Sequence, residues 1–233
     1  MGMGCSSRMW NTARSSGLMT SMEVAKTCDF VVLGVKPQVL PSAAAQIKDA
    51  LAARDGFTVI SMAAGVKIES IEARLGKVPV IRIMPNIPCA SGEGAILYCW
   101  NELVSDETLI AFTQMFDPAG ILMPIEEGKI DAGCAISGCG PAFVYMFIDA
   151  LIDGGVRAGL PRDKAKLLAE QTVLGSAKNA RDSGTEPAKL KADVCSPAGS
   201  TIEGVAVLEE YSFRSAVMEA VKAAFDRTVE LGK

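Results

Sequence analysis

Three short loops carry the residues best suited to bind a ligand, and each follows an apolar segment. They are Lys36-Pro-Gln38, Ala63-Ala-Gly65 and Pro85-Asn-Ile-Pro88. If the preceding segments are parallel strands, the loops share one sheet edge, and open α/β sheets bind ligands outside the carboxyl ends of their strands. Small residues at 63–65 let a flat ligand approach the backbone closely. Gly and Pro are also ordinary turn residues, so the prediction of a site depends on the three loops together.

A second candidate site is the segment Ser196-Pro-Ala-Gly-Ser-Thr201, which lies between two helical stretches. Backbone N–H groups at a helix start, surrounded by hydroxyls, suit a carboxylate. The alternative is an ordinary helix N-cap by Ser200 or Thr201. The residue types alone favour neither interpretation.

A third motif, Ile136-Ser-Gly-Cys-Gly-Pro-Ala142, precedes a long apolar stretch. Its Gly138-Cys-Gly140 resembles part of a dinucleotide-binding fingerprint, but Phe143 stands at the next fingerprint position and no strand-ending acid follows about 20 residues on. The motif is more typical of a hinge between two halves, with Pro141 in a first helical turn.

The composition excludes several kinds of chemistry. None of the 233 residues is histidine, which rules out Ser-His-Asp and Cys-His nucleophilic sites and HExxH zinc proteases. A net charge of -4 gives no positive field for nucleic acid. The seven cysteines form no C-x-x-C pair, so we expect reduced thiols and no metal site. The longest apolar run, Ala142 to Ile148, is too short to predict a membrane span.

The hydrophobic pattern predicts two domains. An α/β domain with a mostly parallel sheet is expected over 1–127, followed by an all-α domain over 128–233. Expected strands lie at 29–35, 57–62, 80–84, 95–99 and 120–125, with helices at about 41–54, 68–75 and 105–116 between them. After residue 127 the pattern predicts helices only, at about 140–158, 162–182, 187–193, 200–210 and 213–231.

These motifs, in this order, resemble the pyrroline-5-carboxylate reductase family over roughly residues 23–231. The most diagnostic block runs from Pro187 to Leu208 and contains Ser196 to Thr201. The other matching blocks are Val35-Lys-Pro-Gln38, Ser61-Met-Ala-Ala-Gly65, Arg82-Ile-Met-Pro-Asn-Ile-Pro88, Ser137-Gly-Cys-Gly-Pro-Ala142 and Gly154-Gly-Val-Arg-Ala-Gly-Leu160. The chain departs from the family at Ile87, where Thr is usual, at Cys139, where Ser is usual, and at Ala198, where Gly is commoner.

The resemblance implies a Rossmann-like dinucleotide-binding domain and a helical substrate-binding and dimerisation domain. The implied reaction is NAD(P)H-dependent reduction of 1-pyrroline-5-carboxylate to L-proline, the last step of proline biosynthesis, in a homodimer or larger assembly. The implied substrate-binding residues are Ser196, Gly199, Ser200 and Thr201, with the Thr201 hydroxyl donating toward the imine nitrogen. The implied cofactor-binding residues are Val35, Lys36, Pro37, Ala63, Ala64, Gly65, Asn86, Ser7 and Arg8. Of these, Ser7 and Arg8 weakly favour NADPH over NADH.

The front of the sequence departs most from the family pattern. The family begins with a strand, a G-x-G-x-x-[GA] phosphate loop and a helix, and the printed sequence contains no such loop. From the sequence we therefore expect a truncated Rossmann-like domain, either an incomplete product or a divergent member with impaired cofactor binding. The alternatives are a catalytically impaired paralogue that acts as an oligomerisation partner, or another small reductase of the same two-domain architecture acting on a different carboxylate.

The first 22 residues allow several interpretations. Arg8, Arg14 and five serines loosely resemble a transit peptide, which would indicate mitochondria. Gly2 with Cys5 and Ser6 fits a short acylation pattern. The preferred alternative is ordinary chain that continues a segment upstream. We expect a cytoplasmic protein, with mitochondria as the alternative.

Overall fold

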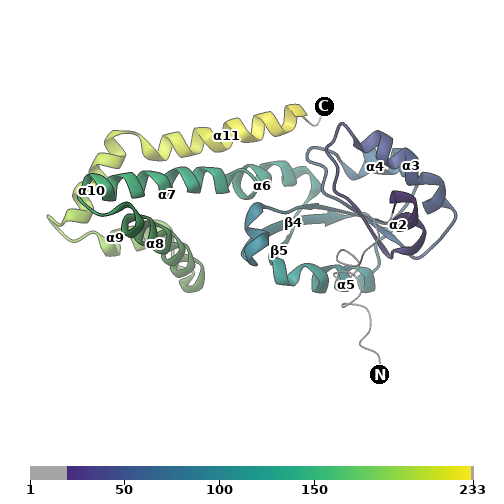
Figure 1. Cartoon of the computed structure of the whole chain (residues 1–233), viewed down its shortest axis with the longest axis horizontal. Helices are drawn as coiled ribbons and strands as arrows, with labels where there is room; N and C mark the ends of the chain where they lie inside the picture. The colour runs from purple at the N-terminus through teal and green to yellow at the C-terminus, as the bar shows by residue number, and fades with distance from the viewer. Residues whose placement is uncertain (1–19, 232–233) are drawn as a thin grey trace, which may run out of the picture. The chain divides into compact units, whose positions relative to one another are not determined.

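The computed structural model describes residues 20–231 and divides into two compact units (Figure 1). Within the described residues, the first unit comprises 20–138 together with the end of the last helix from Ala224 onward, and the second unit is Cys139–Ala223. The domain boundary expected at 127/128 stays a prediction. The expectations for Ser7 and Arg8, and for the acylation pattern at Gly2, Cys5 and Ser6, lie outside the described residues.

A five-stranded sheet forms the centre of the first unit. Its strands are β1 (Phe30–Leu33), β2 (Thr58–Ser61), β3 (Val80–Met84), β4 (Gly94–Trp100) and β5 (Gly120–Pro124), in the order β1-β2-β3-β4-β5. The pairs β1–β2, β2–β3 and β4–β5 are parallel, and β3–β4 is antiparallel. The predicted α/β fold with a mostly parallel sheet is confirmed.

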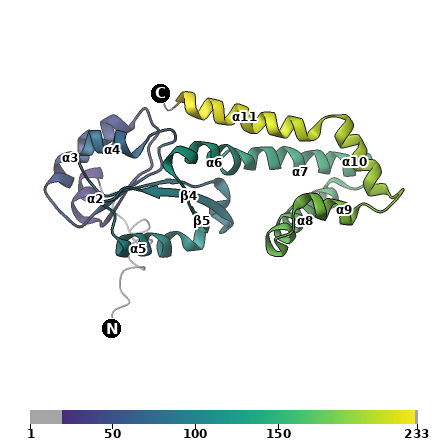
Figure 2. The same cartoon turned by 180° about the vertical axis from the view of Figure 1, so that it is seen from behind.

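Helices cover both faces of this sheet. The structure shows α2 (Ser21–Thr27), α3 (Leu40–Ala52), α4 (Ile68–Leu75), α5 (Asp106–Phe116) and α6 (Ile130–Ser137), with short 3-10 turns η1 (Ile87–Ser91), η2 (Asp117–Ala119) and η3 (Glu127–Lys129). Helices α3 and α4 lie on one face and α5 on the other, as both views show (Figures 1 and 2).

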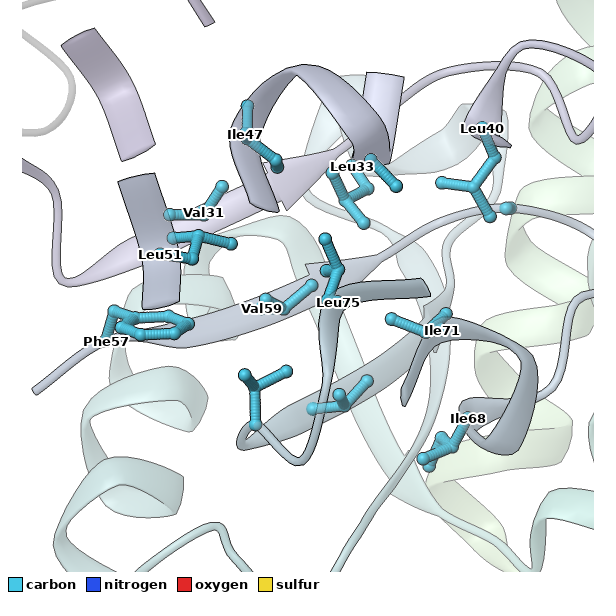
Figure 3. Close-up of a cluster of buried hydrophobic side chains, with 14 of the residues drawn as sticks. Val31, Leu33, Leu40, Ile47, Leu51, Phe57, Val59, Ile68, Ile71 and Leu75 are labelled. Carbon is cyan, nitrogen blue, oxygen red and sulfur yellow. The ribbon is translucent and has the colours of Figure 1, made fainter. Parts of the chain in front are cut away.

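Burial of apolar side chains explains this layering. On the α3/α4 face, Val31, Leu33 and Val59 of the strands meet side chains from both helices (Figure 3). Leu40 and Leu51 of α3 and Ile71 of α4 are 1% exposed, as expected where helical spacing turns one apolar stripe toward a sheet. The opposite face holds Ile60, Ile81, Ile83, Ile96, Tyr98 and Phe112.

The second unit is helical. It contains α7 (Gly140–Arg157), α8 (Arg162–Ser183), α9 (Pro187–Val194), α10 (Ser200–Glu210) and most of α11 (Phe213–Leu231). These bounds agree with the five predicted helices to within one residue at most ends. Helices α2 and α6 were not expected from the sequence pattern. Helix α2 begins with a capping box between Thr20 and Glu23, a signal of helix starts that the printed sequence offers.

The second unit leaves much apolar surface uncovered. Its buried cluster consists of Ile152, Ala165 and Ala169, whereas α7 exposes Val144, Tyr145, Met146 and Phe147. The helical stretch Glu127–Arg157 is also long and apolar enough to cross a membrane by length and composition, with little of its apolar window buried in the subunit. The sequence-based expectation of no membrane span stays a prediction.

Candidate functional site

The structure brings the three predicted loops to one edge of the sheet. Strands β1, β2 and β3 run parallel, so the segments that follow Leu33, Ser61 and Met84 emerge on the same side. The end of β1 and the segment after β2 are joined directly, because the N–H of Met62 donates a 3.2 Å hydrogen bond to the carbonyl of Leu33. After β1 the chain turns at Lys36, whose carbonyl accepts from Val39 at 2.9 Å and from Leu40 at 3.2 Å.

The loop Ala63–Gly65 is a tight turn that is held by hydrogen bonds of its own backbone. The N–H of Ala63 donates to the Ser61 hydroxyl at 3.4 Å, and the N–H of Val66 donates to the Ala63 carbonyl at 3.2 Å. Gly65 has φ +73°, a conformation that favours glycine. Ala63 is buried, while Ala64 and Gly65 are half-buried, so a ligand at this edge would meet backbone and methyl groups.

Asn86 lies at the same edge, but both polar atoms of its side chain bind the protein itself. Its Nδ2 donates to the carbonyl of Ser137 at 2.9 Å, and its Oδ1 accepts from the N–H of Ala95 at 3.0 Å. The Cys89 thiol also lies 3.8 Å from Oδ1. The side chain therefore joins the β3 loop to β4 and to the end of α6.

The residues at this edge fit one half of a nicotinamide cofactor, the half that carries the nicotinamide ring. The residues at 63–65 after β2 are small and leave their backbone open to a planar ring, and Pro37 after β1 adds a flat surface beside the longer side chains of Lys36 and Gln38. The pyrophosphate half needs a glycine-rich loop at a helix start, and residues 20–231 contain no G-x-G-x-x-[GA] segment. Within the described residues, the segment that would hold the pyrophosphate is therefore not found.

An open groove elsewhere in the first unit does not suit a nucleotide. It runs between α4 and the ends of β4 and β5, and its charged lining consists of Glu69, Glu72, Lys77, Glu102, Glu126 and Glu127. Hydrogen bonds from Lys77 and Asn101 hold the pKa of Glu72 below its usual range. Five carboxylates against one ammonium would repel phosphates, so the loops of the strand edge remain the better cofactor site.

The predicted substrate segment forms a tight turn in the second unit. The chain leaves α9 and turns at Ser196, whose carbonyl accepts the N–H of Gly199 at 3.1 Å. Helix α10 begins at Ser200, and Thr201 is its second residue. The structure thus brings Ser196, Gly199, Ser200 and Thr201 together, and places Ser196, Ser200 and Thr201 at the surface of the unit.

Helix α10 is not capped by Ser200 or Thr201, as the ordinary alternative would require. Its N-cap is Gly199, and no side chain accepts a hydrogen bond from its first turn within the described part of the chain. Those N–H groups have no partner inside the helix and carry its positive dipole end. The first turn therefore presents the donors that a carboxylate needs.

Two residues of this turn have demanding backbone geometry. A Cβ at Gly199 would lie 2.3 Å from the Ser196 hydroxyl oxygen and 3.1 Å from the Ser196 carbonyl oxygen, so a larger residue would force the Ser196 side chain to turn away. Ala198 has φ +56°, a left-handed conformation that costs a non-glycine residue roughly 1–2 kcal/mol. This geometry explains why Ala198 is an unusual residue at this position.

A buried ionic cluster beside the sheet was not predicted. Arg82 of β3 is 2% exposed, and its guanidinium lies 2.9 Å from Asp131 and 3.4 Å from Glu127. A buried charge requires such partners. The signal available in the sequence was an arginine inside the otherwise apolar strand Val80–Met84.

The fold and these sites define a class of protein, a two-domain α/β oxidoreductase with a helical second domain. A family model for pyrroline-5-carboxylate reductase dimerisation matches residues 127–231. The pyrroline-5-carboxylate reductase of Arabidopsis thaliana is 42% identical over 214 residues, which are 92% of this chain and 77% of that protein. The enzyme of the same name from Synechocystis is 43% identical over 91% of this chain and 79% of its own.

Solved structures agree with the sequence relatives. The pyrroline carboxylate reductase of Plasmodium falciparum with NADP bound has a TM-score of 0.86 at 37% identity and covers 93% of this chain and 82% of its own. The pyrroline-5-carboxylate reductase of Coxiella burnetii has a TM-score of 0.83 at 34% identity, with 92% and 80% covered. The chain belongs to the pyrroline-5-carboxylate reductase family.

Proposed function

We propose that this chain reduces 1-pyrroline-5-carboxylate to L-proline with a nicotinamide cofactor as reductant. The observation that carries the proposal is the pair of sites, a strand edge that fits a nicotinamide ring in the first unit and an uncapped α10 N-terminus in the second. The family membership adds support, because relatives named pyrroline-5-carboxylate reductase match over 92% of the chain at 42% identity.

The reaction reduces a C=N bond, which needs a hydride on carbon and a proton on nitrogen. The bound cofactor supplies the hydride. In the first unit, Val35, Lys36 and Pro37 together with Ala63, Ala64 and Gly65 would hold its ring and ribose. In this proposal Asn86 acts through the backbone it joins, because its side-chain amide is already hydrogen-bonded.

In the second unit, the N–H groups of Ser200 and Thr201 would hold the substrate carboxylate at the start of α10. The Gly199 N–H already donates to Ser196, so Gly199 contributes through its close backbone approach to Ser196. The exposed Thr201 hydroxyl would donate a hydrogen bond to the imine nitrogen, where electron density grows as the hydride reaches the carbon. Positioning and electrostatics would supply most of the rate.

The finer assignments are also proposals. We infer that NADPH is preferred over NADH, supported by the NADP-bound relative from Plasmodium falciparum. We infer a homodimer or larger assembly through the helical unit, supported by the dimerisation family match over 127–231 and by the exposed apolar side chains of α7. We infer a cytoplasmic location, with mitochondria as the alternative.

The test is to titrate the purified chain with NADPH and NADH, and then to follow cofactor oxidation with 1-pyrroline-5-carboxylate. We expect Thr201→Ala to lower kcat about 100-fold, the size of a lost proton donor, and Thr201→Ser to retain most of it. Thr172→Ala, which changes an exposed threonine on α8, is the matched control. A wild-type rate for Thr201→Ala would remove the proposed role of that hydroxyl.

The second candidate function is an oligomerisation partner without turnover. It is favoured by one observation, that residues 20–231 contain no glycine-rich phosphate loop. The same titration separates the two. Undetectable nucleotide binding by a chain that still assembles through its helical unit would support the second candidate and contradict the first.

A further inference from the structure

The N-terminus of α4 is capped by a side chain from far along the sequence. The N–H of Ile68, the first residue of α4, donates a 2.6 Å hydrogen bond to Oε1 of Glu127. The helix has no N-cap side chain of its own, because Lys67 stands at that position and an ammonium cannot accept a hydrogen bond. A carboxylate at this position also faces the positive end of the helix dipole.

Glu127 is held in place by Arg82. The same Oε1 atom lies 3.4 Å from Nη1 of Arg82, and the arginine side chain is only 3% exposed. A buried guanidinium on the central strand β3 is a rigid anchor, since neither its backbone nor its fork of donors can move without losing partners. The carboxylate that caps α4 is therefore fixed to the sheet.

The capped helix start is also the end of the Ala63–Gly65 loop. The segment that contains this loop begins at Ser61, whose hydroxyl accepts the N–H of Ala63 at 3.4 Å. The segment ends at Ile68. Ser61 pairs with Arg82 across the β2–β3 ladder. Ser61 holds the first end of this segment directly. Arg82, its neighbour on the sheet, holds the other end through Glu127.

The other carboxylate of the cluster extends the arrangement to α6. Nη2 of Arg82 donates to Asp131 at 2.9 Å, in the first turn of α6. The last residue of that helix, Ser137, accepts the amide of Asn86. The guanidinium of Arg82 therefore connects the Ala63–Gly65 loop with α6, the helix that supports the loop Pro85–Pro88 through Asn86.

We propose that Glu127 is a positioning residue that holds the Ala63–Gly65 loop in the shape that receives the nicotinamide cofactor, by capping α4 from its anchor on Arg82. The part that concerns the cofactor rests on the proposed function. The part that concerns the loop rests only on the geometry above. Glu127 does not touch the loop at residues 63–65, so its effect passes through α4.

The experiment uses Glu127→Ala, with Glu126→Ala as the matched control, because Glu126 is a neighbouring exposed carboxylate that lines the same groove. Hydrogen–deuterium exchange of the segment 62–68 is the first readout. We expect exchange there to accelerate roughly 10-fold to 100-fold in Glu127→Ala, the range for losing one charge-assisted hydrogen bond. Exchange in α5, on the opposite face of the sheet, should be unchanged. The control should match the wild type at both places.

The second readout is cofactor binding by the full chain. We expect Glu127→Ala to raise the Kd and KM for the reduced cofactor about 10-fold and to leave the KM for the imine unchanged. Glu127→Gln keeps an acceptor oxygen for Ile68, so we expect its Kd and KM for the reduced cofactor to lie between those of the wild type and Glu127→Ala. The same variant replaces Glu127→Ala in both measurements if the alanine variant does not fold.

The outcomes separate this inference from the proposed function. Unchanged exchange over 62–68, or acceleration that is equal in α5, would overturn the inference whatever the cofactor does. Faster loop exchange with unaltered cofactor affinity would overturn the role toward the cofactor. A wild-type chain that binds no nicotinamide nucleotide would contradict the proposed function, while the exchange measurement would still decide whether Glu127 fixes the loop.

Discussion

The guanidinium of Arg82 donates a 2.9 Å hydrogen bond to the carboxylate of Asp131, which joins strand β3 to helix α6 within the first unit. The two residues are 49 positions apart in the chain. The arginine is buried, and the aspartate side chain is 25% exposed. Through this pair, and through Glu127 as a third member, the start of α6 is attached to strand β3 of the sheet.

Removing Asp131 should destabilise the first unit. Asp131→Ala leaves a buried guanidinium with one carboxylate partner, and we expect a loss of about 3 kcal/mol, the lower end for a broken buried pair. Lys77→Ala breaks an ion pair whose lysine is 76% exposed and should cost much less, because water screens such a pair. Urea unfolding measures both. Equal losses for the two variants would contradict the assignment of Asp131 as a structural partner.

Asn86 should matter for stability as well as for any ligand. Asn86→Ala removes the donor to Ser137 and the acceptor for Ala95, and we expect a loss of about 2 kcal/mol for the two groups left unpaired. Gln38→Ala, an exposed residue of the first loop at the same edge, should change stability by less than about 0.5 kcal/mol. Chemical denaturation of both variants tests this. An Asn86→Ala chain as stable as wild type would show that these hydrogen bonds contribute little.

Ala198 should be replaceable by glycine with a gain in stability. Its φ of +56° is strained for alanine, so we expect Ala198→Gly to stabilise the chain by up to about 1 kcal/mol, net of the greater freedom of glycine when unfolded. Ser212 has φ +57° outside the proposed substrate segment, and Ser212→Gly should give a similar gain. Thermal melts of the two variants provide the comparison. A lower melting temperature for both would refute the strain argument.

Cys99 should be an unreactive thiol with a measurable effect at high pH. Burial, and next the charge of Glu127, raise the pKa of the Cys99 thiol from 9.0 to about 11. The thiolate is the reactive form, so at pH 8 we expect slower alkylation of Cys99 than of the half-buried Cys28. Urea should abolish the difference. Peptide mapping after iodoacetamide treatment measures both rates, and equal rates in the native chain would contradict the burial.

The sign of the pH effect follows from the raised pKa. The folded chain binds the Cys99 proton more tightly than the unfolded chain, so its contribution to folding is fully present below about pH 9 and is lost as pH rises through about 11. Across this window, wild type should therefore lose more unfolding free energy than Cys99→Ala does. Parallel loss in the two proteins would show that Cys99 does not titrate as described.

The local elements were predictable because they depend on local patterns. Apolar runs such as Val80–Met84, turn residues such as Gly76, and helical spacing in 162–182 fixed most strands and helices close to their observed bounds. The likeness of Ser196–Thr201 to a known motif also identified the family. Helix α6 was missed because its eight residues, with Gly133 in the middle and Gly138 directly after the end, have weak periodicity. Packing of Ile130 into the core stabilises this helix.

Residue types and spacing by themselves determined the class of this protein, its sequence of strands and helices, and the segments that could bind a cofactor and a carboxylate. Tertiary structure decided what individual side chains do. It engaged the amide of Asn86 in hydrogen bonds within the protein, left the first turn of α10 without a side-chain cap, and placed Glu127 at the start of α4. These relationships join residues up to 59 positions apart. Such contacts depend on which groups the sheet buries together, because a buried charge or amide must find its partner in space and not along the chain.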